Sequence, residues 1–112
     1  MKIETRSVYD VLVVDMSGRL DSMSSGDAGD RIVDIAKGEH KRVLLNLEKL
    51  EYVSSAGLRV LLLLAKQMRA DKGSLALCGL GDRVRQVFEL AGFLPLFRIA
   101  STRGAALDQI AV

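Results

Sequence analysis

One stretch of the chain, residues 43–70, constrains its fold more than any other. It opens with an apolar run, Val43 to Leu47, that has the length and composition of a buried strand. It closes with residues 58–70, which are apolar almost all round and therefore predict a helix buried against another layer. A buried strand followed by such a helix is typical of an α/β fold, in which the helix packs on the sheet.

A small polar turn, residues 53–58, joins this strand to this helix, and we call it the serine turn. Ser54 and Ser55 are both good helix N-cap residues, because a hydroxyl there can accept a hydrogen bond from a free amide of the first turn. Gly57 lowers helix stability by about 0.5–1 kcal/mol relative to alanine. It is easier to understand where another backbone approaches closely, from within the fold or from a partner. Spacing alone slightly favours an ordinary capped helix over a functional site.

The other segments alternate between the two kinds of element. The first two predicted strands are joined by so short a link that we expect an antiparallel hairpin, with Ser17-Gly18 ending the second strand. The later alternation predicts right-handed crossovers and parallel strands. We therefore expect one α/β domain over residues 1–112, a mostly parallel sheet with an antiparallel N-terminal edge strand, in the order β-β-α-β-α-β-α-β-α. Besides 43–47 and 58–70, the predicted strands are 2–7, 11–16, 74–78 and 96–99, and the predicted helices 25–37, 82–91 and 102–110.

Composition and charge exclude several classes of protein. The 112 residues are 49% hydrophobic, and the net charge of +2 arises from basic residues dispersed among 14 acids, unlike the footprint of a dedicated nucleic-acid binder. The longest apolar run, residues 60–65, is far shorter than the roughly 20 residues that cross a bilayer. The N-terminus lacks the apolar core of a signal peptide. We expect a soluble cytoplasmic protein that neither binds nucleic acid nor inserts into a membrane.

Candidate catalytic residues are few. His40, the single histidine, enters the central strand at the end opposite to the serine turn, which disfavours a histidine-activated nucleophile. Cys78 lies in an apolar run and is expected to be a small buried residue. Gly79-Leu80-Gly81 follows a predicted strand, but Val84 replaces the third glycine of a dinucleotide-binding fingerprint, so a tight turn is the better interpretation. We expect no catalytic residue, no metal site and no cofactor.

Three segments resemble one known family. Residues 46–58, NLEKLEYVSSAGL, resemble the signature of the STAS domain, and specifically that of the bacterial anti-sigma factor antagonists, single-domain proteins of partner-switching systems. Gly18-Arg19-Leu20-Asp21 resembles the family's G-x-L-D segment after the second strand. Residues 87–93, VFELAGF, resemble its late apolar helix followed by a glycine. The three segments stand in the family's order and span nearly the whole chain, so the resemblance implies a STAS-like fold.

The resemblance also implies a function. Members of this family are not enzymes. A GHKL-type serine kinase, itself the anti-sigma factor, phosphorylates them at the tip of the second long helix. The unphosphorylated form binds that kinase and releases its other target, and a metal-dependent serine phosphatase resets the switch. By position in the motif the phosphorylated residue is Ser55. Members often have an aspartate just before it, where this chain has Ser54, so Ser54 is the alternative acceptor.

The same resemblance indicates where the kinase would bind. Asp21 falls where the family has an acidic residue in the loop beside the phosphorylation site. Arg59 follows Ser55 by four residues, about one helical turn, so the two should share a face, where Arg59 could pair with an acid of the partner or simply lie in solvent. We expect a monomer whose partner-binding residues are Asp21, Ser24, Ser54, Gly57 and Arg59.

Two other functions remain open at this point. The chain could be a STAS subunit that binds a ligand or acts as a scaffold in a larger assembly or beside a membrane transporter. A small enzyme is the third alternative, and the lack of a histidine–nucleophile pair argues against it.

Overall fold

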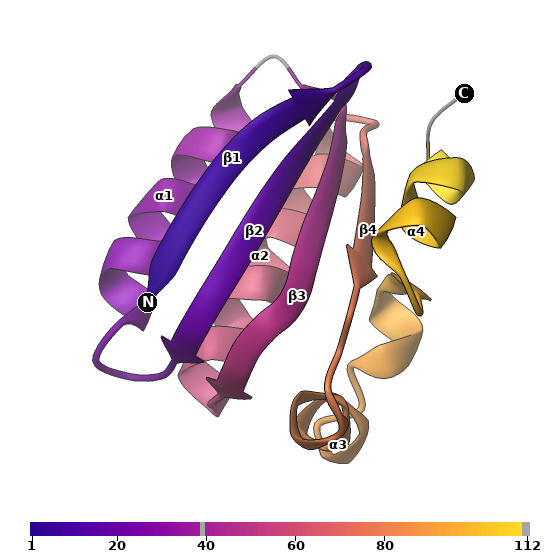
Figure 1. The fold of residues 1–112 in the computed structure, drawn as a ribbon. Helices are drawn as coiled ribbons and strands as arrows, with labels where there is room; N and C mark the ends of the chain where they lie inside the picture. Colours follow the sequence, from indigo (N-terminus) through magenta and orange to yellow (C-terminus); the bar gives the residue numbers. More distant parts are fainter. Residues whose placement is uncertain (39, 111–112) are drawn as a thin grey trace.

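The computed structural model describes residues 1–38 and 40–110, and its elements follow the predicted order (Figure 1). The strands are β1 (Lys2–Val8), β2 (Val11–Leu20), β3 (Arg42–Val53), β4 (Ser74–Cys78) and β5 (Arg98–Ala100). The helices are α1 (Ser25–Lys37), α2 (Ser55–Ala70), α3 (Asp82–Leu90) and α4 (Arg103–Ile110), with a short 3-10 turn at Leu94–Leu96.

The strands form one sheet in the order β1-β2-β3-β4-β5. β1 pairs antiparallel with β2, whereas β2–β3, β3–β4 and β4–β5 all pair in parallel. The hairpin closes through Tyr9 and Asp10, and Tyr9 adopts a positive φ of 55° there. The mostly parallel sheet with an antiparallel N-terminal edge strand is therefore confirmed.

The two central strands are longer than the sequence predicts. Ser17-Gly18 does not end β2; Gly18 adopts φ +97° and the strand runs on to Leu20. β3 likewise continues past Leu47 to Val53, and Leu20 and Val53 are paired. The register shifts twice along the pair, and such irregularities break the alternation of apolar residues by which a strand is recognised. The extensions bring residues 21 and 54 to the same edge of the sheet.

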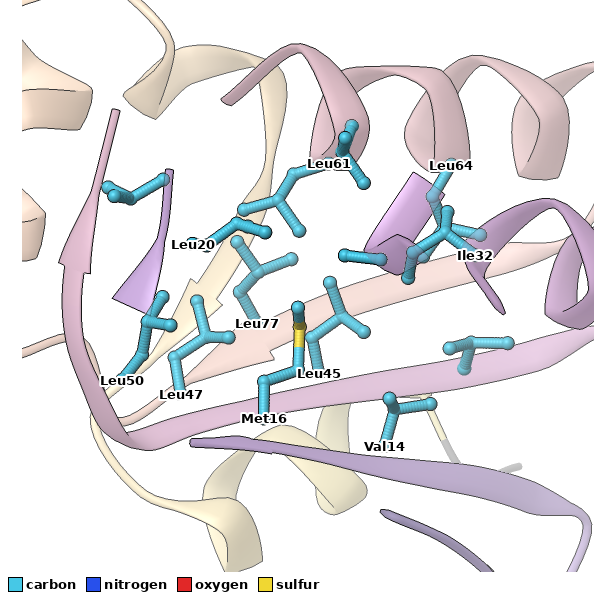
Figure 2. Close-up of a cluster of buried hydrophobic side chains, with 14 of the residues drawn as sticks. Val14, Met16, Leu20, Ile32, Leu45, Leu47, Leu50, Leu61, Leu64 and Leu77 are labelled. Atoms are coloured by element: carbon cyan, nitrogen blue, oxygen red, sulfur yellow. The ribbon is translucent and has the colours of Figure 1, made fainter. Parts of the chain in front are cut away.

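The helices divide between the two faces of the sheet. α1, α2 and α3 pack on one face and share the larger core with the strands, whereas α4 covers part of the other face over Leu44, Ala76 and Cys78. Figure 2 shows side chains of α1 and α2 pointing toward those of the strands in that larger core. Cys78 is fully buried, as expected.

The apolar helix predicted over residues 58–70 packs against another layer as expected, but only one side of it contacts the sheet and α1, and Leu63 is 56% exposed. One local prediction is wrong. The last strand is not residues 96–99, because Pro95 lies in the 3-10 turn that precedes it, so pairing with β4 begins only at Arg98. Among the described residues, no helix combines the length and apolar character needed to cross a membrane.

Candidate functional site

The ends of β2 and β3 bring two loops together at the carboxyl edge of the sheet. Ser54 donates its backbone amide to the carbonyl oxygen of Leu20 at 2.9 Å, which ties the serine turn to the start of the loop at Asp21. In open α/β sheets, the carboxyl ends of parallel strands are where binding sites are built. Asp21 and Ser54, two of the site residues expected from the sequence, therefore lie on the same edge of the molecule.

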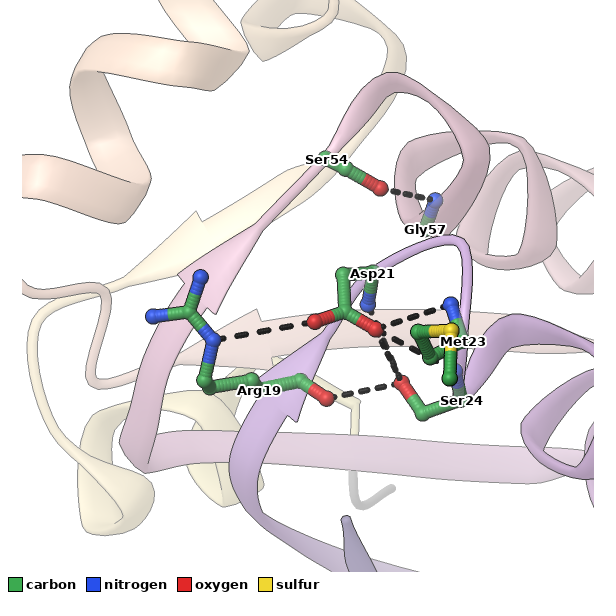
Figure 3. A network of polar contacts seen from close by, with 6 residues as sticks. All are labelled: Arg19, Asp21, Met23, Ser24, Ser54 and Gly57. Atoms are coloured by element: carbon green, nitrogen blue, oxygen red, sulfur yellow. Dashed lines mark hydrogen bonds and ion pairs between the residues drawn. The ribbon is translucent and has the colours of Figure 1, made fainter.

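Ser54 caps α2. Its backbone is extended, at φ −95° and ψ 175°, and its hydroxyl accepts a hydrogen bond from the Gly57 amide at 3.2 Å (Figure 3). Its carbonyl oxygen accepts the first bond of the helix, from Leu58 at 2.8 Å. Both oxygens of this half-buried residue are therefore engaged in starting the helix.

Ser55 differs from its neighbour although the two residues are chemically identical. It is the first residue of α2, it is exposed, and within the described chain its hydroxyl has no hydrogen-bond partner. It stands at the positive end of the helix dipole, where a negative charge is favoured. Of the two possible caps that the sequence leaves open, Ser54 takes the role and Ser55 presents a free hydroxyl.

Gly57 is buried at a point of close approach inside the fold. A Cβ atom added to it would lie 2.5 Å from the Leu20 carbonyl oxygen and 3.0 Å from a methyl carbon of Val53. Any side chain would therefore push the serine turn away from the end of β2. Of the two sources of close approach considered from the sequence, the backbone that approaches Gly57 is the protein's own. Gly57 acts on the site surface by placing the turn.

Asp21 holds its loop together through several hydrogen bonds. Its Oδ1 accepts from the backbone amides of Met23, at 3.0 Å, and Ser24, at 3.2 Å (Figure 3). The Ser24 hydroxyl accepts from the Asp21 amide at 3.0 Å and donates to the Arg19 carbonyl oxygen at 2.7 Å. The bond from the Ser24 amide is the main cause that lowers the pKa of Asp21, helped by the Met23 amide and the Arg19 charge and opposed by partial desolvation. Asp21 is therefore a carboxylate at neutral pH.

Arg19 and Tyr52 belong to this edge but are absent from the residues expected from sequence. The Arg19 guanidinium carbon lies 4.4 Å from the centre of the Tyr52 ring, and its Nε is 3.6 Å from Asp21 Oδ2. Arg19 in β2 and Tyr52 in β3 are paired in the sheet, and both lie beyond the residue at which the sequence predicts their strand to end. The contact between Arg19 and Tyr52 could have been predicted only if the pairing of these extra strand residues had been known. The pair adds a cation, stacked on a half-exposed ring, beside the Asp21 loop.

Arg59 is exposed one turn along α2 from Ser55, and it enters none of the ion pairs among the described residues. Met23, between Asp21 and Ser24, is 91% exposed. Together with Ser55 they give this edge an apolar, a cationic and a hydroxyl group that face solvent. Such a surface suits contact with another protein.

The structure does not support the catalytic or cofactor-binding roles considered for His40 and for the glycine turn at residues 79–81. His40 lies at the far end of β3, with its Nε2 3.5 Å from the Ser7 hydroxyl. Gly79 adopts φ +74° against the Glu48 backbone, as the tight-turn interpretation requires. In residues 1–38 and 40–110, no three His, Cys, Asp or Glu side chains are grouped so that they could hold a metal ion.

Comparison with known proteins agrees with this architecture. The family model of the STAS domain matches residues 2–106. A protein of Bordetella bronchiseptica, BtrV, named as a candidate anti-sigma factor antagonist, is 42% identical over 107 residues, which are 95% of this chain and 91% of the relative.

Solved structures show the same fold. A candidate anti-sigma factor antagonist from Thermotoga maritima superposes with a TM-score of 0.90 at 20% identity, over 98% of this chain and 95% of that one. The Bacillus cell fate determinant SpoIIAA, in its phosphorylated form, superposes with a TM-score of 0.73 at 22% identity, over 97% and 99% of the two chains. The chain therefore belongs to the STAS domain family and is a relative of the anti-sigma factor antagonists.

Proposed function

We propose that this protein is an anti-sigma factor antagonist that works as a phosphorylatable partner-switching module and not as an enzyme. Its unphosphorylated form binds a GHKL-type serine kinase that is also the anti-sigma factor, and this frees the kinase's other target. Phosphorylation of Ser55 ends the binding, and a metal-dependent serine phosphatase restores it. The observation that carries the proposal is the exposed, unengaged hydroxyl of Ser55 beside a Ser54 occupied as the helix cap.

Two features of the relatives support this reading. BtrV, which shares 42% of its residues with the matched part of the chain, is named as a candidate anti-sigma factor antagonist. SpoIIAA, which has the same fold, has been solved in a phosphorylated form. A fold of this kind can therefore carry a phosphate, and the most accessible serine hydroxyl in the serine turn is that of Ser55.

Electrostatics explains how the phosphate could change binding without unfolding the protein. A phosphoserine carries about −1.5 to −2 charges at neutral pH. At the start of α2 that charge is favoured by some 0.3–1 kcal/mol through the helix dipole. At a closely packed interface, an uncompensated charge is unfavourable by about 3–5 kcal/mol. Because the second term is several times the first, we expect a loss of roughly 100- to 1000-fold or more in affinity from a domain that stays folded.

The proposed contact surface surrounds Ser55. Asp21, kept ionised by its loop, would face a cation of the kinase, and Arg59 would face an acid. Ser24 and Gly57 would contribute by fixing the loop and the serine turn, since Ser24 bonds inside the loop and Gly57 is buried. Ser54 would border the surface while it caps the helix. We propose that the protein meets its partners as a monomer in the cytoplasm.

Phosphorylation by the kinase tests the assignment directly. The unmodified protein is incubated with ATP and a GHKL-type serine kinase from its own genome, and the modified peptide is sequenced by mass spectrometry. Phosphate is expected on Ser55, and Ser54→Ala should still be modified while Ser55→Ala should not. Phosphate confined to Ser54 would move the acceptor by one residue. No modification by any encoded serine kinase would reject the switch and favour a scaffold or ligand-binding STAS subunit.

A further inference from the structure

A second surface lies at the amino edge of the parallel strands, the edge opposite to Ser55. There, the end of α2 and the starts of β4 and β5 enclose an open hollow of about 300 Å³. Ser55 and Arg69 are separated by most of α2, about 21 Å at 1.5 Å per residue. This hollow is therefore distinct from the serine turn, and we call it the basic hollow.

Its charged groups have one sign. Arg69, Lys72 and Arg98 line the basic hollow, and no acidic residue is among its lining residues. None of the three takes part in an ion pair between described residues. Asp71 is adjacent, but its carboxylate accepts a hydrogen bond from Gln67 at 3.1 Å and does not line the hollow. The uncompensated positive charge would attract an acidic ligand.

A larger hollow, on the face of the sheet formed by β1, β2 and β3, differs from the basic hollow in how its charges are paired. It measures about 470 Å³ and also contains cations, but acids lie between them. Lys2 is 3.1 Å from Glu4, and Arg6 is 3.4 Å from Asp15. Two of its four cations are thus paired with acids of the protein itself. None of the three cations of the basic hollow has such an ion pair among the described residues, so they would need a partner to supply the acids.

Apart from Ser74, the remaining side chains that line the basic hollow are apolar. Leu75 and Phe97 are half-buried in it, and Leu96, presented by the 3-10 turn, is 44% exposed. Three cations around an apolar floor do not fit a nucleic acid, which is bound along an extended basic stripe or face. They fit a short peptide that places an apolar side chain on the floor and carboxylates on the rim.

The rim is also rigid. In the turn after α2, Lys72 donates its amide to the Arg69 carbonyl at 3.1 Å, and Gly73 donates to Met68 at 2.7 Å. Gly73 lies so close to Lys41 that an added Cβ would be 2.8 Å from the Lys41 carbonyl oxygen. A preformed surface loses little conformational entropy when a ligand binds. The cations are therefore attached to a backbone that is already fixed.

We propose that the basic hollow binds an acidic segment of a partner protein, with one apolar or aromatic side chain of that segment seated on Leu75, Leu96 and Phe97. Binding there does not depend on the proposed switch at Ser55, because the two surfaces occupy opposite ends of α2. The molecule would then hold one partner at the basic hollow while it gains or loses another at the serine turn.

The test uses a defined probe, the N-acetylated and C-amidated peptide Asp-Glu-Leu-Phe-Glu-Asp. It is titrated into the isotopically labelled full chain and followed by two-dimensional NMR, at peptide concentrations up to about 5 mM since weak binding is expected. Shifts should concentrate in residues 65–75 and 96–98, and the affinity should fall as salt is added. The peptides Asn-Gln-Leu-Phe-Gln-Asn and Asp-Glu-Ser-Ser-Glu-Asp should each bind at least about fivefold more weakly, because each lacks one half of the recognition.

Variants locate the binding. Arg69→Glu combined with Lys72→Glu should lower the affinity about tenfold or more, and Leu96→Ser about threefold. Arg83→Glu, which reverses an exposed cation on α3, should leave it unchanged, as should Ser55→Asp. Thermal melts would verify that each variant is folded. Shifts spread over the whole surface, no measurable binding, equal loss in Arg83→Glu, or tighter binding of a ten-nucleotide oligothymidylate at the same residues would each overturn the proposal.

Discussion

The two ends of α2 are held in the same way but present different chemistry. At the start, a Cβ on Gly57 would lie 2.5 Å from the Leu20 carbonyl oxygen, and at the end, one on Gly73 would lie 2.8 Å from that of Lys41. At each end, a glycine lets the helix terminus pack closely against the backbone of a neighbouring segment. The start presents an uncharged hydroxyl beside the Asp21 loop, whereas the end opens onto the basic hollow.

This difference teaches that charge, more than shape, distinguishes the surfaces of this domain. Both turns are fixed by backbone hydrogen bonds and by close packing, so a rearrangement of either turn would be strongly unfavourable in free energy. A change in function at either end is then most easily made by adding or removing charge. A phosphate on Ser55 would be such a change at one end, and it would leave the other end as it was.

The largest expected effect is on partner binding at the start of α2. Ser55→Asp should weaken binding to the kinase by about 100-fold or more, because the carboxylate must be desolvated at the interface. The fold should be unaffected, since a negative charge in the first turn of a helix is favoured. Calorimetric titration against the kinase measures the affinity, and a circular dichroism melt measures the stability.

Ser55→Ala is the matched control for that substitution. It adds no charge and should bind as wild type does. If Ser55→Asp binds as tightly as Ser55→Ala, the serine turn is a helix cap and no switch. Binding of the acidic probe peptide to the basic hollow should be the same in both variants, which separates a change at one end from a change in the whole domain.

The next largest effect concerns the two glycines that pin the helix. Gly57→Ala should lower the free energy of unfolding by about 1–3 kcal/mol, because the new methyl group meets the Leu20 backbone and the Val53 side chain. Gly73→Ala should lower it less, since one of its nearest atoms is the flexible end of Met68. Gly26→Ala, in α1 with nothing within 4 Å, should be neutral or raise stability by about 0.5–1 kcal/mol. Urea unfolding gives all three values, and equal effects at the three positions would contradict this account.

Much of the fold is predictable from local patterns. The order of the elements, the N-terminal hairpin and the burial of Cys78 follow from the length, spacing and apolar character of short segments. These features depend on neighbours in sequence. The serine turn is recognisable for the same reason, because the strand before it and the helix after it are both strongly apolar.

Features that depend on distant residues are not predictable in this way. The register shifts in β2 and β3 hide the true strand ends, and with them the contact between Arg19 and Tyr52. An apolar helix does not reveal which of its sides the sheet and α1 will leave open, so the exposure of Leu63 is unexpected. Which of Ser54 and Ser55 caps the helix and which is exposed depends on the residue at which α2 begins, and a shift of one residue would exchange them.

That division gives a third, smaller prediction. Ser54→Ala should lower the free energy of unfolding by about 0.5–2 kcal/mol, because the Gly57 amide loses its acceptor. Ser55→Ala should change it by no more than about 0.5 kcal/mol, as is usual for an exposed residue whose side chain makes no internal bond. Parallel thermal melts of the two variants make the comparison. The opposite ranking would place the cap at Ser55 and would free Ser54 as the acceptor.

The smallest effect concerns pH and the Asp21 loop. Because the hydrogen bond from the Ser24 amide lowers the pKa of Asp21 below its ordinary value of 3.8, the carboxylate stabilises the folded state at every pH above that value. The contribution is lost as the pH falls through the lowered pKa of the folded state. Asp21→Asn should therefore be less stable than wild type at neutral pH, and the difference should shrink as urea titrations are taken below pH 3.8. Ser24→Ala should keep this pH dependence, since the main donor is a backbone amide. A difference between Asp21→Asn and wild type that stays constant down to the lowest pH would mean that the loop depends on the shape of Asp21 and not on its charge.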